Sequence, residues 1–157
     1  MSNSVKKIPD GYHTITPYIV LEDASAGIEF YKKAFDAKAR GKMPTPDGRL
    51  MHAEIQIGDS IIMMSSEFPE MGGTAKSPKK AGFATSSLLI YAEDTDAVFQ
   101  NAIKQGATEV MAPQDMFWGD RYAKVRDPFG HEWQIATHIE DVSPEEMAAR
   151  AQELYGN

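Results

Sequence analysis

The chain has 157 residues, of which 42% are hydrophobic and 25% charged, and its formal net charge is −7 at pH 7. This composition is typical of one soluble globular domain spanning 1–157, and the negative charge argues against nucleic acid as a partner. The lack of cysteine excludes disulfides, thiol catalysis and cysteine-ligated metals. We find neither a signal peptide nor a stretch apolar enough to span a bilayer, so we expect a cytoplasmic protein with no membrane partner.

An internal repeat with a shift of 71 residues organises the chain. Asp23 recurs as Asp94, and each is preceded by a glutamate and by an apolar strand-like run, over 15–21 and 87–91. Each aspartate stands where it can cap a helix, because its short side chain accepts hydrogen bonds from the exposed N–H groups of a first turn. The repeat therefore predicts a strand followed by a helix in both halves.

The first half continues as a helix and three strands. Ile28, Tyr31 and Phe35 share one face of the helix, since they are spaced i, i+3 and i+7. Three strand-like runs separated by turn sequences follow the helix, over 37–43, 50–57 and 60–65. These elements predict a βαβββ module over 13–66.

The second half repeats this order. Phe99, Ala102 and Ile103 share a helix face, and strand-like runs follow over 108–112, 121–126 and 131–137. A second βαβββ module is therefore predicted over 83–140. The predicted fold class is α+β, with two tandem modules that form a curved mixed sheet around a cleft.

Two further segments lie outside the modules. The stretch 67–82 is rich in Gly, Pro and Lys, and we interpret it as a linker, with a lid over the cleft as the alternative. Ser143 and Glu146 form a capping-box pattern with proline at the first helical position, which predicts a C-terminal helix over 143–155. The apolar stripe of this helix is interpreted as a packing surface rather than a membrane anchor.

Several stretches resemble one known family. Residues 18–35 resemble the opening module of the glyoxalase, bleomycin-resistance and extradiol-dioxygenase superfamily, whose architecture is called vicinal oxygen chelate, and 127–131 resemble its closing signature. Within it, 51–54, 118–121 and 137–146 most resemble the PhnB-like branch. The resemblance implies two modules that curve into a cleft, and a homodimer as the oligomeric state. Because this fold hosts many reactions, it does not specify the chemistry.

The resemblance also implies four positions that carry metal ligands in metal-dependent relatives. Here they fall on Thr16, Met63, Ser87 and Gln134, and the 71-residue shift relates the first to the third and the second to the fourth. None is an imidazole or a carboxylate, which a divalent transition metal needs. We therefore expect no metal at these positions and no cofactor, with a metal site relocated elsewhere in the chain as the alternative.

The predicted ligand site lies in the cleft. Strand alternation turns Tyr18 to the same side as Thr16, and methionine and aromatic side chains there suit a small, partly apolar organic ligand. Met51, Met63, Met64 and Met116 are expected near the cleft or its walls. The predicted ligand-binding residues are Tyr18, His52, Glu54, Met63, Trp118, Arg121 and Gln134.

Trp118 and Arg121 have individual roles in this prediction. Trp118 is expected to stack on or cap the ligand, because a large aromatic in a polar loop has no evident core face to join. Arg121 is expected either to pair with Asp120 or Glu132 or to meet an anionic group of the ligand.

Three classes of function are left open by these observations. The first is a small-molecule-binding protein that works without the usual metal. The second is an enzyme of the lyase, isomerase or dioxygenase type, with a relocated metal or with His52 and Glu54 as an acid–base pair. The third is a dimeric scaffold with a vestigial cleft. A methyltransferase is rejected, because no glycine-rich turn follows a first parallel strand.

Overall fold

The computed structural model describes residues 5–156, and the chain divides into two compact units between Phe83 and Ala84. Each unit contains one four-stranded sheet. The predicted organisation as a single domain stays a prediction.

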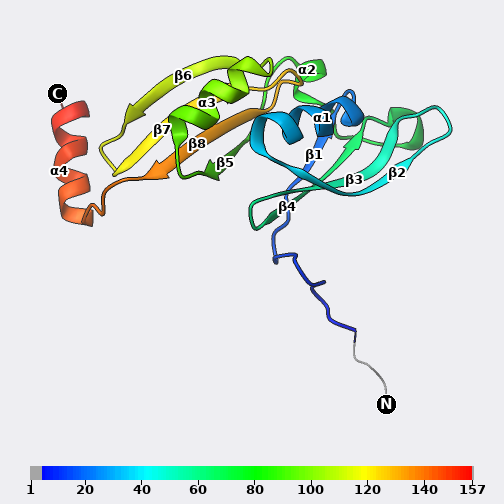
Figure 1. The fold of residues 1–157 in the computed structure, drawn as a ribbon, viewed down its shortest axis with the longest axis horizontal. Coiled ribbons are helices and arrows are strands. Elements are labelled where there is room, and N and C mark those ends of the chain that lie inside the picture. The colour runs from blue at the N-terminus through cyan, green and yellow to red at the C-terminus, as the bar shows by residue number, and fades with distance from the viewer. Residues whose placement is uncertain (1–4, 157) are drawn as a thin grey trace. The chain divides into compact units, whose positions relative to one another are not determined.

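The first unit contains the first βαβββ order (Figure 1). Its elements are β1 (Tyr18–Leu21), α1 (Ala24–Phe35), β2 (Lys38–Pro44), β3 (Leu50–Ile57) and β4 (Ser60–Ser66). The strands are ordered β1-β4-β3-β2, with β1 parallel to β4 and the other neighbours antiparallel. The parallel pair is possible because α1 and the two following strands carry the chain back to the same end of the sheet.

The second unit repeats this arrangement. Its elements are β5 (Ser87–Tyr91), α3 (Thr95–Lys104), β6 (Thr108–Asp115), β7 (Asp120–Arg126) and β8 (Glu132–His138), followed by α4 (Pro144–Tyr155). The strands are ordered β5-β8-β7-β6, again with one parallel pair, β5 with β8. The predicted α+β fold with tandem βαβββ modules and a C-terminal helix is confirmed.

The same hydrogen bonds join strand and helix in both units. Asp23 Oδ1 accepts from the Ala26 N–H (3.0 Å), and Asp94 Oδ1 accepts from the Ala97 N–H (2.9 Å), as the predicted caps require. Residues related by the 71-residue shift therefore make the same capping hydrogen bonds in the two units.

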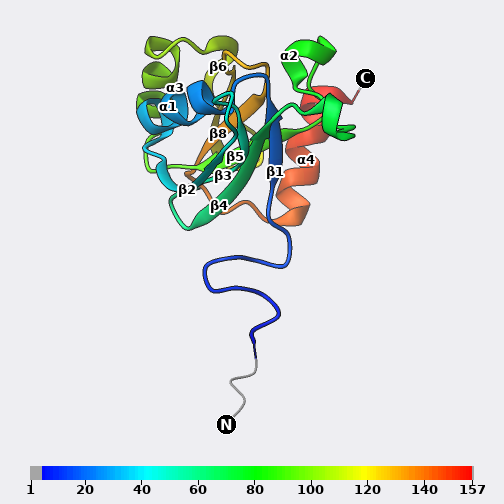
Figure 2. The ribbon, with the colours of Figure 1, turned by 90° about the vertical axis from the view of Figure 1, so that its right-hand side faces the viewer.

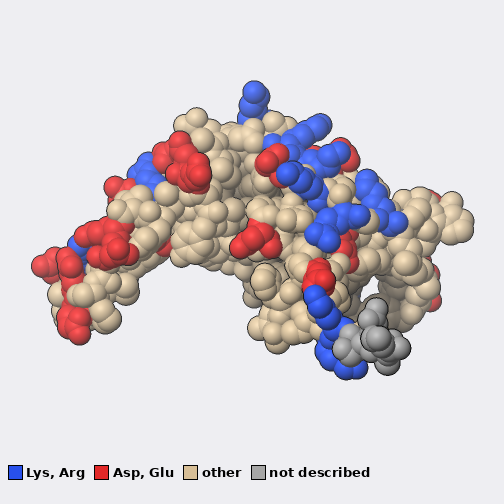
Figure 3. Space-filling view, turned by 60° about the horizontal axis from the view of Figure 1, so that its bottom comes forward, with Lys and Arg blue, Asp and Glu red and all other residues tan. Residues whose placement is uncertain are grey.

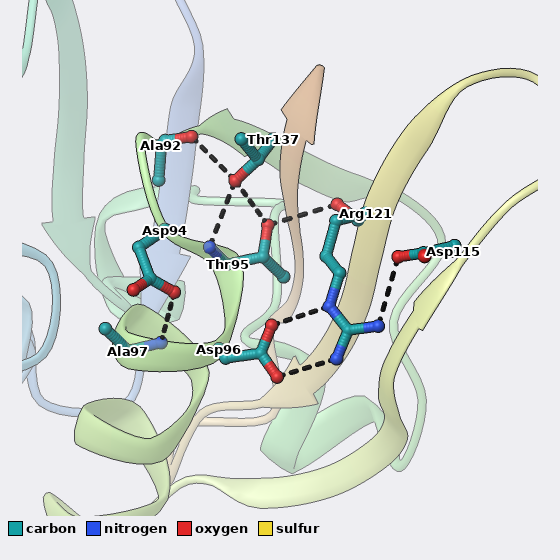
Figure 4. Close-up of polar contacts among 8 residues, drawn as sticks. All are labelled: Ala92, Asp94, Thr95, Asp96, Ala97, Asp115, Arg121 and Thr137. Carbon is teal, nitrogen blue, oxygen red and sulfur yellow. Dashed lines mark hydrogen bonds and ion pairs between the residues drawn. The ribbon is translucent and has the colours of Figure 1, made fainter. Parts of the chain in front are cut away.

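A second repeated contact comes from the end of the last strand. Ser66 Oγ accepts from the Ala24 N–H (3.4 Å), and Thr137 Oγ1 accepts from the Thr95 N–H (3.0 Å) (Figure 4). Since the first N–H groups of a helix have no partner within the helix, these hydroxyls satisfy donors that would otherwise be left without one.

One face of each sheet is covered by the helix of its unit. In the first unit Leu21, Ile28, Tyr31, Ile55 and Met64 are fully buried there, and Gly27 allows close approach, because a Cβ at this position would overlap the Leu21 side chain. In the second unit the buried residues include Val125, Trp133 and Ile135. Alternate strand residues point to the opposite side, which we call the open face of each sheet.

Two segments differ from the expectations. The strand predicted from Ile15 begins only at Tyr18, since Pro17 lacks an N–H to donate to the sheet, although its carbonyl accepts from the Met63 N–H (2.9 Å). Figure 2 shows the segment before β1 without regular secondary structure. The predicted linker contains two short helices, η1 (Pro69–Met71) and α2 (Pro78–Ala81).

The C-terminal helix α4 has a half-formed capping box. Ser143 Oγ accepts from the Glu146 N–H (3.2 Å), but the Glu146 carboxylate bonds to Arg150. Arg150 also reaches Glu140 and the carbonyl of Phe117, which ties the helix to the loop before β7. Figure 3 shows acidic side chains gathered at this helix, and none of its residues is buried.

Candidate functional site

The open face of the first sheet brings together four of the predicted site residues. Tyr18 on β1 is the register partner of Met63 on β4, and Met63 is also the register partner of Glu54 on β3. His52 lies two residues before Glu54 and therefore on the same face. Tyr18, His52, Glu54 and Met63 are thus neighbours, contributed by three adjacent strands.

Three side chains of this group form a chain of polar contacts. The Tyr18 hydroxyl lies 3.3 Å from His52 Nδ1, and His52 Nε2 lies 3.2 Å from Glu54 Oε1. Exposure falls along the chain, from half of Tyr18 to 33% of the His52 side chain and 16% of the Glu54 side chain. The phenol is therefore the end that solvent and a ligand can reach.

Tyr12 completes this contact chain and was not predicted. Its hydroxyl donates to Glu54 Oε2 (2.5 Å). This hydrogen bond is the main reason that the pKa of Glu54 lies below its ordinary value, with His52 contributing and burial opposing, and it raises the pKa of Tyr12. Tyr12 precedes β1 in an irregular segment, so no periodic pattern in the sequence could have placed it here.

A buried carboxylate organises the open face of the second sheet. Asp120 is 5% exposed, and its Oδ2 accepts from Trp118 Nε1 (3.0 Å) and from the Tyr91 hydroxyl (3.4 Å). The Trp118 ring makes edge contacts with Phe117 and Tyr122, at centroid distances of 5.1 and 5.6 Å. Trp118 is therefore held in one orientation while remaining partly exposed.

His138 joins this cluster from the end of β8. Its Nδ1 lies 2.9 Å from Asp120 Oδ1 and its Nε2 lies 2.9 Å from Asp141 Oδ1. The contacts with Asp141 and then Asp120 raise the pKa of His138. Because carboxylates only accept hydrogen bonds, contact through both ring nitrogens favours the doubly protonated imidazolium.

The positions implied as metal ligands do not fit a metal. Ser87 and Gln134 lie on the open face of the second sheet and bond to each other, with Gln134 Nε2 donating to Ser87 Oγ (2.5 Å). Thr16 precedes β1, and its hydroxyl donates to the His13 carbonyl (3.2 Å). Hydroxyl, amide and thioether groups are a poor donor set for a transition metal. Within residues 5–156 no three His, Asp or Glu side chains are grouped as a metal site.

Arg121 lies on the helix-covered side of the second sheet, near Asp96 and Asp115 (Figure 4). Its guanidinium donates to both carboxylate oxygens of Asp96 on α3 (2.6 and 2.7 Å) and to Asp115 on β6 (3.1 Å). The expected partners Asp120 and Glu132 were therefore wrong, because Arg121 points to the helix-covered side of the sheet. The hydrogen bonds from Arg121 hold the pKa of Asp96 below its ordinary value.

The methionines divide between the two faces. Met63 lies half-buried on the open face, but Met64 is fully buried against α1, so its expected place near the cleft is corrected. Met43 on β2 is the register partner of His52 and is 55% exposed, and sequence reasoning missed it. Only the pairing of β2 with β3 places it there.

None of the helices within residues 5–156 has the length and apolarity that crossing a bilayer requires. This finding concerns the helices of the structure alone.

Comparison with known proteins places this geometry in a family. A family model described as Glyoxalase/Bleomycin resistance protein/Dioxygenase superfamily matches residues 12–135. An uncharacterized protein of Mycobacterium tuberculosis is 40% identical over 136 residues, which cover 86% of this chain and 80% of that protein. The solved structure of TioX from Micromonospora sp. ML1 is similar with a TM-score of 0.64 at 22% identity, over 81% of this chain and 99% of that one. A PhnB protein from Bacillus cereus is similar with a TM-score of 0.60 at 18% identity, over 80% and 99%. The chain therefore belongs to the Glyoxalase/Bleomycin resistance protein/Dioxygenase superfamily.

Proposed function

We propose that the protein binds a small, partly apolar organic ligand without the metal of its metal-dependent relatives. The observation that carries this proposal is the partly exposed Trp118, whose indole N–H is held by the buried carboxylate of Asp120. A large aromatic surface that is already fixed in orientation loses little conformational entropy when a ligand stacks on it.

The surroundings of Trp118 support a ligand with an aromatic or otherwise apolar part. Tyr122 packs against the edge of the indole, and Tyr91, which is 66% exposed, donates to the same carboxylate. Leu89, two residues before Tyr91 on β5, is 43% exposed and lies on the same open face. A few fixed polar groups among apolar side chains are the usual composition of a small-molecule site.

The first test is to find the ligand and measure the part played by Trp118. Native mass spectrometry of the purified chain would detect a bound compound, and a thermal-shift screen of small aromatic compounds would supply probes. Trp118→Ala should weaken binding of these compounds about tenfold, since ring contacts contribute on the order of 1 kcal/mol beyond buried area. The affinity of Trp118→Phe should lie between those of the unchanged chain and Trp118→Ala, because phenylalanine keeps a ring but loses the hydrogen bond to Asp120.

Trp133→Phe is the matched control for this experiment. Trp133 is 1% exposed on the helix-covered side of the same sheet, so this variant should leave the affinity unchanged. Equal affinities in folded Trp118→Ala and the unchanged chain would refute the proposed site.

We also propose that the chain forms a homodimer in the cytoplasm. Two-module chains of this family commonly form dimers, and twofold dimers are the most frequent soluble oligomers in general. Light scattering across a wide concentration range should give twice the chain mass, and a constant monomer mass would contradict the proposal.

A further inference from the structure

The contacts of His52 define which of its nitrogens carries a proton. Glu54 is ionised at neutral pH, because its pKa lies below the ordinary value, and a carboxylate only accepts hydrogen bonds. The nitrogen facing it, Nε2, must therefore be the N–H that donates across 3.2 Å. In the neutral imidazole Nδ1 is then an acceptor, and the group in front of it is the Tyr18 hydroxyl, 3.3 Å away.

A hydroxyl, an imidazole and a carboxylate in this order are the arrangement that activates a nucleophile. A hydroxyl lies within reach of a base, and the base is oriented by a third, ionised group. Contacts of this kind are often longer before a substrate is bound, so 3.2–3.3 Å is compatible with proton transfer in a complex. The hydroxyl end is half exposed, while the carboxylate end is the least exposed of the three side chains.

We infer that Tyr18, His52 and Glu54 form a nucleophilic site that accepts an acyl group from an activated ester. Tyr18 Oη attacks the acyl carbon while its proton passes to His52 Nδ1. The ester C–O bond breaks, and the alcohol part leaves as its anion. The products are an O-acyl tyrosine, the leaving anion and an imidazolium, so charge and atoms balance, and Glu54 stabilises the imidazolium through the Nε2–H.

Tyr12 and Glu54 act as positioning residues in this site. Tyr12 donates to Glu54 Oε2, which leaves Oε1 for His52. Holding the carboxylate from two sides fixes the direction in which His52 presents Nδ1. The inference concerns the first sheet and does not rest on the binding site proposed around Trp118.

The experiment uses p-nitrophenyl acetate and the full chain. Release of p-nitrophenolate is followed by absorbance, and acetylated tyrosines are located and timed by peptide mass spectrometry. Tyr155 is the internal standard, because it is 72% exposed and so no less accessible than Tyr18. General-base assistance contributes about 10²–10⁴-fold in enzymes, so we expect Tyr18 to be acetylated at least about tenfold faster than Tyr155.

Variants test the role of each group. His52→Gln should bring the acetylation rate of Tyr18 down to that of Tyr155. Glu54→Gln and Tyr12→Phe should lower it by smaller factors while the rate at Tyr155 stays the same, a selectivity that a merely structural role would not produce. His13→Gln, an exposed histidine outside the contact chain, is the matched control and should change nothing.

The ratio of acetylation rates between Tyr18 and the reference tyrosine, measured on the unchanged chain, tests the inference even if a variant fails to fold. An acetylation rate at Tyr18 equal to that at Tyr155 would overturn the inference. Acetylation of Tyr18 that stays fast in folded His52→Gln would overturn it as well, because the base would then not be His52.

Discussion

The two units share their supporting contacts but differ on their open faces. Asp23 and Asp94 cap their helices in the same way, and Ser66 and Thr137 occupy the same place at the strand end. On the open faces, by contrast, Tyr18 beside Met63 in the first unit corresponds to Leu89 beside Gln134 in the second.

This difference indicates which positions the fold itself requires. A hydroxyl that satisfies the first N–H of a helix is needed wherever this strand–helix junction is built, whatever the unit does. Residues on the open face make no such contact, so they are free to differ. The first unit carries a tyrosine, histidine and glutamate chain there, and the second carries aromatic rings around Asp120.

The largest difference in stability is expected in the two cores. Trp133 and Ile62 are related by the 71-residue shift, and they are 1% and 5% exposed. Trp133→Ala should cost about 3–5 kcal/mol and Ile62→Ala about 2–4 kcal/mol. The tryptophan should cost more because its Nε1 also donates to buried Asp127 (2.9 Å).

Chemical denaturation followed by circular dichroism would measure both losses. Trp133→Phe, which keeps one aromatic ring but loses the indole N–H and part of the ring volume, is the control and should cost less than Trp133→Ala. An Ile62→Ala loss that matches or exceeds that of Trp133→Ala would show that the two cores do not differ as their side chains indicate.

The hydroxyl at the strand–helix junction should contribute more to stability in the second unit than in the first. Thr137 Oγ1 makes contacts of 2.8–3.0 Å with Ala92 and Thr95, whereas Ser66 Oγ makes contacts of 3.3–3.4 Å with Leu50 and Ala24. Thr137→Val should therefore cost about 1–3 kcal/mol and Ser66→Ala about 0.5–1.5 kcal/mol. Equal losses, measured in the same denaturation assay, would argue against a stability difference between the two junctions.

The two aspartate caps should contribute equally to the free energy of unfolding. Asp23→Ala and Asp94→Ala remove hydrogen bonds of 3.0 and 2.9 Å, so each should cost about 1 kcal/mol. Asp23→Asn and Asp94→Asn are the controls, since asparagine also caps helices well. A clear difference in stability between the two alanine variants would show that the two caps do not stabilise their units equally.

The smallest effect is expected for Arg121, and it should depend on pH. Because the folded-state pKa of Asp96 is lowered by Arg121, the pair stabilises the fold above the ordinary carboxyl pKa and loses this contribution as the pH falls through the lowered value. The melting temperature of Arg121→Gln should thus lie slightly below that of the unchanged chain at pH 7, and the gap should narrow as the pH falls below the ordinary carboxyl pKa. A gap that widens in acid would contradict the pairing with Asp96.

The repeat, the helix caps and most strands could be predicted from the amino-acid sequence alone. The ranges predicted for β3 and β5 match Leu50–Ile57 and Ser87–Tyr91 to the residue. These features depend on neighbours within a few residues, such as a capping aspartate before an amphipathic stretch or a Gly-Asp turn between two apolar runs. They can therefore be inferred without knowing how the chain folds back on itself.

The partners of the site residues could be identified only from the folded structure. Arg121 pairs with Asp96, 25 residues away, and Tyr12 reaches Glu54, 42 residues away. Such contacts depend on which strands are adjacent and in which register, and on where the helix docks, because each of these moves a side chain by several ångströms or to the other face. For that reason the pattern could place His52 and Glu54 on one face but could not show that Tyr12 and Tyr18 meet them there.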